Sequence, residues 1–161
     1  MRYTYNSMEE YVKKMYNTIG IYWPHQLNME TIASRLGATI IYLPYESVTV
    51  HDLILIDDRL TKSEQWQDFG HELCHIEWHD GNQRVLPSSY SEYREWKAYN
   101  FAYHACVPTF MLDRMILPRS EVKAIYMIQK TFNVDYDFAK KRLDQYMSKH
   151  IRITIGGLKY D

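Results

Sequence analysis

Hydrophobic positions recur with helical spacing over much of the chain, and the clearest example lies near its middle. Between residues 61 and 80, apolar side chains follow one another at steps of three and four residues, on one helix face: Trp66, Phe69, Leu73 and Ile76. Thr61 and Glu64 have the spacing of a capping box. We therefore predict a helix that begins after Thr61, continues to Asp80 and ends at Gly81.

Capping signals predict two helices before this segment. Ser7 and Glu10 have capping-box spacing and indicate a helix that runs to Gly20. Asn28 can cap a shorter helix, which Gly37 would close because glycine adopts the left-handed conformation that ends many helices.

The C-terminal half is also predicted to be helical. After a loop through Pro87, Ser91 can cap a helix that reaches the Val107–Pro108 break, because proline cannot continue a helix. Two more helices fit the remaining pattern, at about 120–131 and 136–149.

Two stretches before the central helix favour strands instead. Residues 38–43 are apolar and β-branched, and residues 51–57 alternate in polarity. The tail at 151–161 could form a strand or a flexible end. The expected fold is α+β, mostly helical, with a small β-sheet before the central helix, in a single domain over 1–161.

Composition excludes several classes of function. The 161 residues carry 19 basic and 20 acidic side chains with no basic block, so we expect no direct nucleic-acid binding. No apolar run approaches the roughly 18 residues of a membrane span, and the N-terminus does not have the pattern of a signal peptide. Cys74 and Cys106 form no disulfide framework, so a cytoplasmic protein is expected.

The central helix also carries the sequence HELCH, which suggests metal chemistry. His71 and His75 are four residues apart, so both imidazoles project from one helix face, as two zinc ligands would. Glu72, next to His71, could act as the base that accepts a proton from water and passes it to a leaving amine. The alternative is a solvated polar face, because HExxH also occurs by chance.

A catalytic zinc needs a third protein ligand and an open position. His79 lies one turn beyond His75, but it is rotated by about 80° from His71 on a continuous helix, so we assign it a structural or rim role. A glutamate from the following helix is preferred. Glu92 and Glu95 both qualify, and their pattern alone does not separate them.

These segments together resemble the ImmA/IrrE family of zinc metallopeptidases. There, HELGH precedes a helix of the form E-x-x-A-N-x-F-A-x-x-L-L-M-P, and five residues fit this frame without a gap: Glu95, Ala98, Phe101, Ala102 and Pro108. The resemblance covers about residues 30–145. It implies a zincin-like fold and Zn²⁺ held by His71, His75 and Glu95, the last being a gluzincin-type third ligand.

Two positions depart from the family pattern. The glycine of HELGH is Cys74, which we interpret as a space-filling thiol, with a redox-sensitive group or an extra ligand as alternatives. The family's asparagine is Tyr99, whose hydroxyl could orient a ligand histidine. The residue that would stabilise the oxyanion stays open among four side chains: Tyr103, His104, Tyr126 and Tyr136.

The predicted function is that of a zinc-dependent endopeptidase acting on a protein. The resemblance implies a substrate of the helix-turn-helix repressor class, from a prophage or mobile element, so that the enzyme would be an anti-repressor. A regulatory module that binds its partner without hydrolysis is the alternative, and the intact Glu72 favours the enzyme. A structural zinc would need a fourth ligand, from His79 or Cys74.

Overall fold

The computed structural model describes residues 5–78 and 88–156. Its helices are α1 (Ser7–Thr18), η1 (Pro24–Gln26), α2 (Met29–Arg35), α3 (Lys62–Glu77), α4 (Ser88–Cys106), α5 (Thr109–Leu112), α6 (Glu121–Phe132) and α7 (Tyr136–Gly156). Its strands are β1 (Thr39–Leu43), β2 (Val48–Val50) and β3 (Leu53–Asp57). The predicted α+β class, mostly helical with a small sheet ahead of the central helix, is confirmed.

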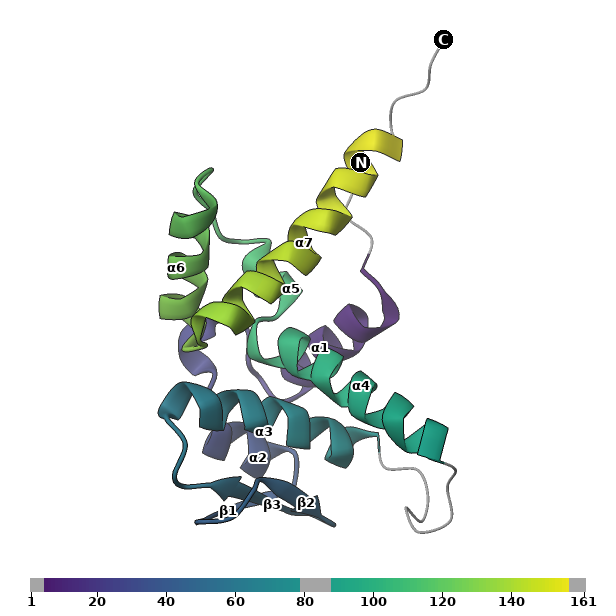
Figure 1. Cartoon of the computed structure of the whole chain (residues 1–161), viewed down its shortest axis with the longest axis vertical. Coiled ribbons are helices and arrows are strands. Elements are labelled where there is room, and N and C mark those ends of the chain that lie inside the picture. The colour runs from purple at the N-terminus through teal and green to yellow at the C-terminus, as the bar shows by residue number, and fades with distance from the viewer. Residues whose placement is uncertain (1–4, 79–87, 157–161) are drawn as a thin grey trace.

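The sheet lies at one end of the molecule, and α2 and α3 cover one of its faces (Figure 1). Its strand order is β1-β3-β2, with β1 parallel and β2 antiparallel to β3. Ile54 and Ile56 alternate along β3, and both are completely buried. The central strand is thereby anchored in the core, and β2 forms one edge of the sheet.

β2 was not predicted from the sequence. It has three residues, and the paired register runs from Val48 opposite Leu55 to Val50 opposite Leu53. A strand this short contains too little alternation to be distinguished from a loop, and its pairing with β3 is what defines it.

Two of the four predicted helix N-caps are confirmed. Thr61 and Glu64 form the predicted capping box of α3, and the Asn28 side chain accepts a hydrogen bond from the Thr31 N–H at the start of α2. The box predicted for Ser7 and Glu10 is wrong. The structure forms it one residue earlier, between Asn6 and Glu9, because the asparagine carbonyl accepts the Glu9 N–H and the Glu9 carboxylate accepts the Asn6 N–H.

Helix α3 ends at Glu77, three residues before the predicted end at Asp80. The backbone of Trp78 leaves the helical region, and its ring packs against Tyr11 and Phe101, with ring centroids 4.7 and 5.1 Å away. Burying this ring against α1 and α4 competes with continuing the helix. The predictions for His79 and for Gly81 as the stop concern residues 79–87, which lie outside the described part.

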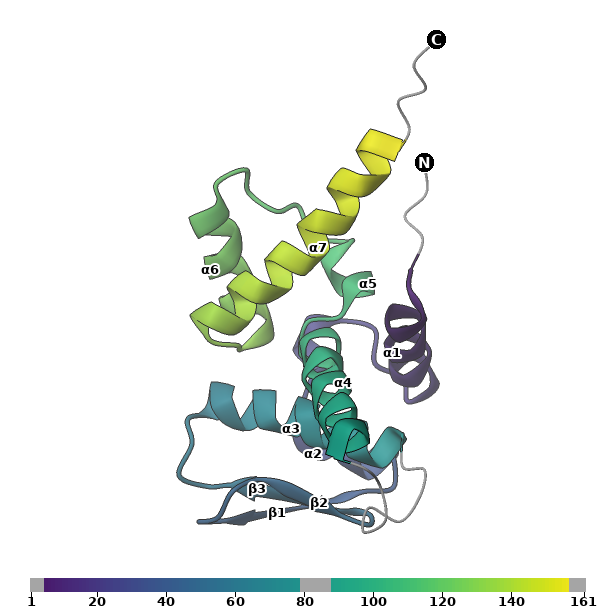
Figure 2. The ribbon, with the colours of Figure 1, turned by 45° about the vertical axis from the view of Figure 1, so that its right-hand side comes forward.

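The C-terminal helices differ from prediction in length. α4 begins at Ser88 instead of after Ser91, and it ends at Cys106, immediately before the predicted Val107–Pro108 break. α7 continues to Gly156, so a strand at 151–156 is wrong. This end of α7 points away from the sheet (Figures 1 and 2), where a strand would have no neighbour to pair with.

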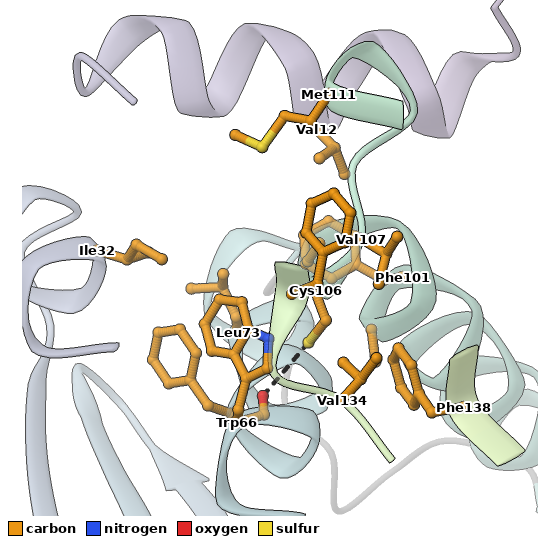
Figure 3. Close-up of a cluster of buried hydrophobic side chains, with 14 of the residues drawn as sticks. Val12, Ile32, Trp66, Leu73, Phe101, Cys106, Val107, Met111, Val134 and Phe138 are labelled. Atoms are coloured by element: carbon orange, nitrogen blue, oxygen red, sulfur yellow. Dashed lines mark hydrogen bonds between the residues drawn. The ribbon is translucent and has the colours of Figure 1, made fainter. Parts of the chain in front are cut away.

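Close packing between α3 and α4 fixes the position of the central helix. A Cβ atom at Gly70 would lie 2.6 Å from the Cys106 Sγ and 3.3 Å from the Ala102 Cα, so only glycine permits this approach. The Cys106 thiol donates a hydrogen bond to the Trp66 carbonyl at 3.3 Å, within the buried cluster that joins the helices (Figure 3). The face of α3 that carries HELCH is therefore held against α4.

None of the helices within the described residues combines the length and apolar character that crossing a bilayer requires.

Candidate metal centre

The two histidines of HELCH lie on α3 with their rings directed to the same point. The Nε2 atoms of His71 and His75 are 3.3 Å apart, and their ring centroids are 5.1 Å apart. This is the result expected for positions four residues apart on a regular helix. Both side chains are 14% exposed, so the two nitrogens remain accessible from the groove beside α3.

Glu95 on α4 completes a set of three donors. Its Oε2 atom lies 3.1 Å from the His71 Nε2, and its Oε1 atom lies 3.5 Å from the His75 Nε2. Tetrahedral zinc with bonds of about 2.0–2.2 Å separates its ligand atoms by about 3.3–3.6 Å. The two imidazole nitrogens and the carboxylate oxygens that face them therefore already lie at nearly the spacing that the ligands of one zinc ion require.

The chemistry of the donor set fits zinc as well. Two imidazole nitrogens and one carboxylate are typical ligands of a catalytic zinc, which keeps a fourth position open. The His71 Nδ1 atom is buried and has no hydrogen-bond partner among the described residues. The supporting hydrogen bond that usually orients a metal-binding histidine is thus not supplied to His71 by this part of the chain.

Glu92, the alternative third ligand, does not belong to this set. It lies one turn before Glu95 on α4, and its side chain is exposed. It is not among the residues that line the groove beside α3. Sequence pattern left the two glutamates equivalent, whereas the crossing of α3 and α4 brings Glu95 to the histidines.

Glu72, the predicted base, lies beside these donors but in a different environment. It is only 7% exposed, and its Oε2 accepts a hydrogen bond from the Thr49 hydroxyl at 2.8 Å. Burial raises the pKa of the Glu72 carboxyl above its ordinary value, and the bond from Thr49 partly opposes this shift. The donor atoms of His71, Glu72 and His75 lie within 4.8 Å of one another.

A groove of about 820 Å³ gives access to the centre. One wall comes from β2 and the residue before it, with Ser47, Val48 and Thr49, and the opposite wall comes from α4 and α7. The Ser47 hydroxyl donates to the Asp68 carboxylate at 2.7 Å, which ties the strand wall to α3. The centre is therefore open along a trough between an edge strand and a helix.

The remaining predicted residues divide clearly by position. Of the four oxyanion candidates, Tyr103 lines the groove, and His104, Tyr126 and Tyr136 do not. Cys74 is buried and does not line the groove either, and burial raises the pKa of its thiol to about 12, which agrees with a space-filling role.

Tyr99 lies at the centre but contacts it differently from the prediction. Its ring meets the His71 ring edge to face, with centroids 4.5 Å apart, and the side chain is 62% exposed. The His71 Nδ1 receives no hydrogen bond from it. The ring, rather than the hydroxyl, is what Tyr99 presents to the histidine.

Thr49 was not identified as a site residue from the sequence. Its strand was not predicted, and its contact with Glu72 joins residues 23 positions apart. The one local signal is the pattern Val48-Thr49-Val50, in which a polar side chain stands between two apolar ones. That pattern indicates which side chains share a face, but not which helix the face meets.

The chain is similar to known proteins of one family. Residues 25–144 match a peptidase family described as the IrrE N-terminal-like domain. The chain is 37% identical to an uncharacterized protein, YqaB, of Bacillus subtilis (strain 168), over 92% of this chain and 89% of YqaB. It is 41% identical to the phage-like element PBSX protein XkdA of the same strain, over 86% of this chain and 72% of XkdA. The chain therefore belongs to the ImmA/IrrE peptidase family, as its two motifs indicated.

Proposed function

We propose that the protein is a zinc-dependent endopeptidase in which His71, His75 and Glu95 hold the metal and Glu72 is the catalytic base. The observation that carries the proposal is the close approach of the donor groups of these three side chains, 3.1 to 3.5 Å between facing atoms, with a separate buried carboxylate beside them. Membership of a peptidase family supports the same reaction class.

Each side chain has a distinct part in peptide hydrolysis. When bound, zinc supplies a Lewis acid that activates water and polarises the scissile carbonyl. Glu72 accepts a proton from the attacking water and delivers it to the amine nitrogen that leaves. Its burial suits this exchange, because a raised carboxyl pKa brings proton uptake and release closer to neutral pH. Tyr103, on the groove wall, is the remaining candidate among the four for bonding the developing oxyanion.

The groove favours an extended peptide as substrate. β2 is an edge strand and lines the groove, so a substrate segment can pair with it as an additional strand and pass across the centre. The groove also reaches residues of α4 and α7 on the other side, so the peptide is enclosed between two walls. This arrangement favours cleavage within a chain rather than at its end.

The substrate class rests on family resemblance. We propose a helix-turn-helix repressor of a prophage or mobile element, cleaved by this protein as an anti-repressor. The similarity to a protein named for a phage-like element supports that biological setting. Binding to the repressor, and not to DNA, is then the route of action, in agreement with the near-zero net charge of −1.

The experiment combines metal analysis with cleavage of a purified prophage repressor, followed by mass spectrometry. Wild type should contain one zinc per chain and cut the repressor, and Glu72→Gln should keep zinc but lose at least about 100-fold in rate. Glu92→Gln is the matched control, because it removes an exposed glutamate outside the groove. Near wild-type cleavage by Glu72→Gln would exclude Glu72 as the base. Equal binding of the repressor by wild type and Glu72→Gln, with cleavage by neither, would favour the non-hydrolytic module.

A further inference from the structure

The contact between Thr49 and Glu72 links the edge strand to the candidate base. The Thr49 hydroxyl lies 2.8 Å from the Glu72 Oε2 and 3.1 Å from the Glu72 main-chain oxygen. Thr49 is half-buried, while its neighbours Val48 and Val50 are 44% and 49% exposed. The strand thus points its polar side chain inward and its apolar ones outward, the reverse of the usual arrangement.

This reversal needs a reason, and the buried carboxylate supplies one. An ionised carboxylate that is almost fully removed from water is costly unless hydrogen-bond donors face it. Glu72 is 7% exposed, and the Thr49 hydroxyl donates to it from a strand whose backbone is held by pairing with β3. Because threonine is β-branched, its side chain has few rotamers, so the donor is held in place before any substrate binds.

The contact also determines which way the carboxylate faces. The bond from Thr49 engages Oε2, and Oε1 has no hydrogen bond to a described side chain. The ligand atoms of His71, Glu72 and His75 are within 4.8 Å of one another, so a small rotation would bring the carboxylate to the metal. Holding Oε2 against β2 keeps Glu72 apart from the three donors and leaves its other oxygen for a proton.

We infer that Thr49 is a positioning residue for the catalytic base, which holds the Glu72 carboxylate on the strand side of the groove. This inference rests on the proposed peptidase function. Thr49 also stands in the edge strand that the substrate would pair with, so one residue joins substrate binding to the orientation of the base.

The test compares two substitutions at this position. Thr49→Val keeps the shape and the strand preference but removes the hydroxyl, and Thr49→Ser keeps the hydroxyl. For a peptide cut by wild type, Thr49→Val should lower kcat about 10–100-fold, as misplacement of a catalytic group does, and leave KM within about 2-fold. Thr49→Ser should restore most of kcat. Thr39→Val, at the exposed start of the opposite edge strand, is the matched control and should change neither constant.

A second measurement does not depend on activity. In metal-free protein, the melting temperatures of Thr49→Val, Glu72→Ala and the double variant should be non-additive, because the two side chains share a bond. Zinc should still bind to Thr49→Val at one per chain. Additive melting shifts, wild-type kcat in Thr49→Val, or a serine variant as slow as the valine variant would each overturn the inference. A wild-type protein that cuts no peptide would instead count against the proposed function, while the melting cycle still tests the contact.

Discussion

Two clusters of acidic and histidine side chains lie on opposite sides of α4, and they differ in what surrounds them. In the candidate metal centre, His71, His75 and Glu95 direct their donor atoms to one point. The second group, which we term the buried polar cluster, joins α1, α4, α5 and α7: Glu9, His104, Thr109, Arg142 and Lys149.

The carboxylate of the buried polar cluster is paired with a cationic side chain, so it is not available to bind a metal. The Glu9 carboxylate accepts the Thr109 hydroxyl at 3.0 Å and forms an ion pair with Lys149. The Arg142 guanidinium donates to the Thr109 hydroxyl at 2.7 Å, and its side chain is almost fully buried. A buried carboxylate with cationic partners of this kind holds helices together, since removing one partner would leave the other uncompensated.

Residue type therefore does not decide the role of such a cluster. His104 and His71 were both candidates for chemistry from the sequence, yet His104 bonds the Asn100 carbonyl at 3.0 Å and faces Glu9, away from the groove. His71 faces His75 and Glu95 at 3.3 and 3.1 Å, and all three side chains line the groove. What differs is the presence of basic partners in one cluster and the convergence of donors on an accessible point in the other.

The sharpest test of this contrast is to remove one histidine from each cluster. Loss of a residue that only supports a metal ligand typically lowers metal affinity by about 10–100-fold. His75→Ala should lower zinc affinity by more than this, because the substitution removes a side chain that binds the metal directly. His104→Gln should bind zinc as wild type does. Competition with a chromophoric chelator measures both affinities. Equal loss of zinc in the two variants would show that the buried polar cluster contributes to the metal site.

A second pair of variants separates the two glutamates of α4. Glu95→Ala should lower zinc affinity by at least about 10-fold, because one of the three donors is removed. Glu92→Ala, one turn away and exposed, should retain wild-type affinity. The reverse result would move the third ligand to Glu92 and would contradict the observed crossing of α3 and α4.

The contrast also shows where sequence reasoning succeeds. The cap at Thr61, the apolar face of α3 and the two histidines four residues apart are local features, and helix geometry turns them into a defined face. The choice of Glu95 over Glu92 came from family resemblance, because spacing along one helix says nothing of what stands opposite. In the structure, Gly70 allows α4 to approach closely enough to bring Glu95 to that face.

Other features depend on contacts between distant parts of the chain. β2 is defined by pairing with β3, and Thr49 acquires its partner only because that strand lies against α3. The tail was expected to be a strand or a flexible end, and instead α7 extends to Gly156, on the side of the molecule away from the described sheet. Such features depend on which elements become neighbours, and hydrophobic periodicity does not encode this directly.

The pH dependence of stability tests the buried polar cluster alone. Burial lowers the pKa of His104 to about 4, with Arg142 and Lys149 acting in the same direction and Glu9 opposing them. Between pH 4 and about 6.5 the unfolded chain binds a proton at His104 that the folded protein does not, so stability falls as the pH falls through this window. The loss should be at most about 3 kcal/mol.

Metal-free protein is the appropriate sample, because zinc release at low pH would add its own effect. Chemical denaturation of wild type and His104→Gln at pH 4, 5.5 and 7 measures the free energy of unfolding. The stability of wild type relative to the variant should rise with pH up to about 6.5 and then stay constant. A difference that does not change with pH would mean that His104 titrates alike in the folded and unfolded states.

The smallest expected effect concerns Tyr99, at the edge of the candidate metal centre. Tyr99→Phe keeps the ring that meets His71 at 4.5 Å and removes only the hydroxyl. The His71 Nδ1 has no hydrogen-bond partner among the described residues, so zinc affinity should change by less than about 2-fold. Loss of a hydrogen bond that supports a metal ligand would instead lower zinc affinity by about 10–100-fold. Tyr99→Ala is the companion variant, because it also removes the ring contact. It should lower zinc affinity more than Tyr99→Phe does. A 10-fold loss in Tyr99→Phe would show that the hydroxyl reaches His71 when zinc is bound, and would restore the role predicted from the sequence.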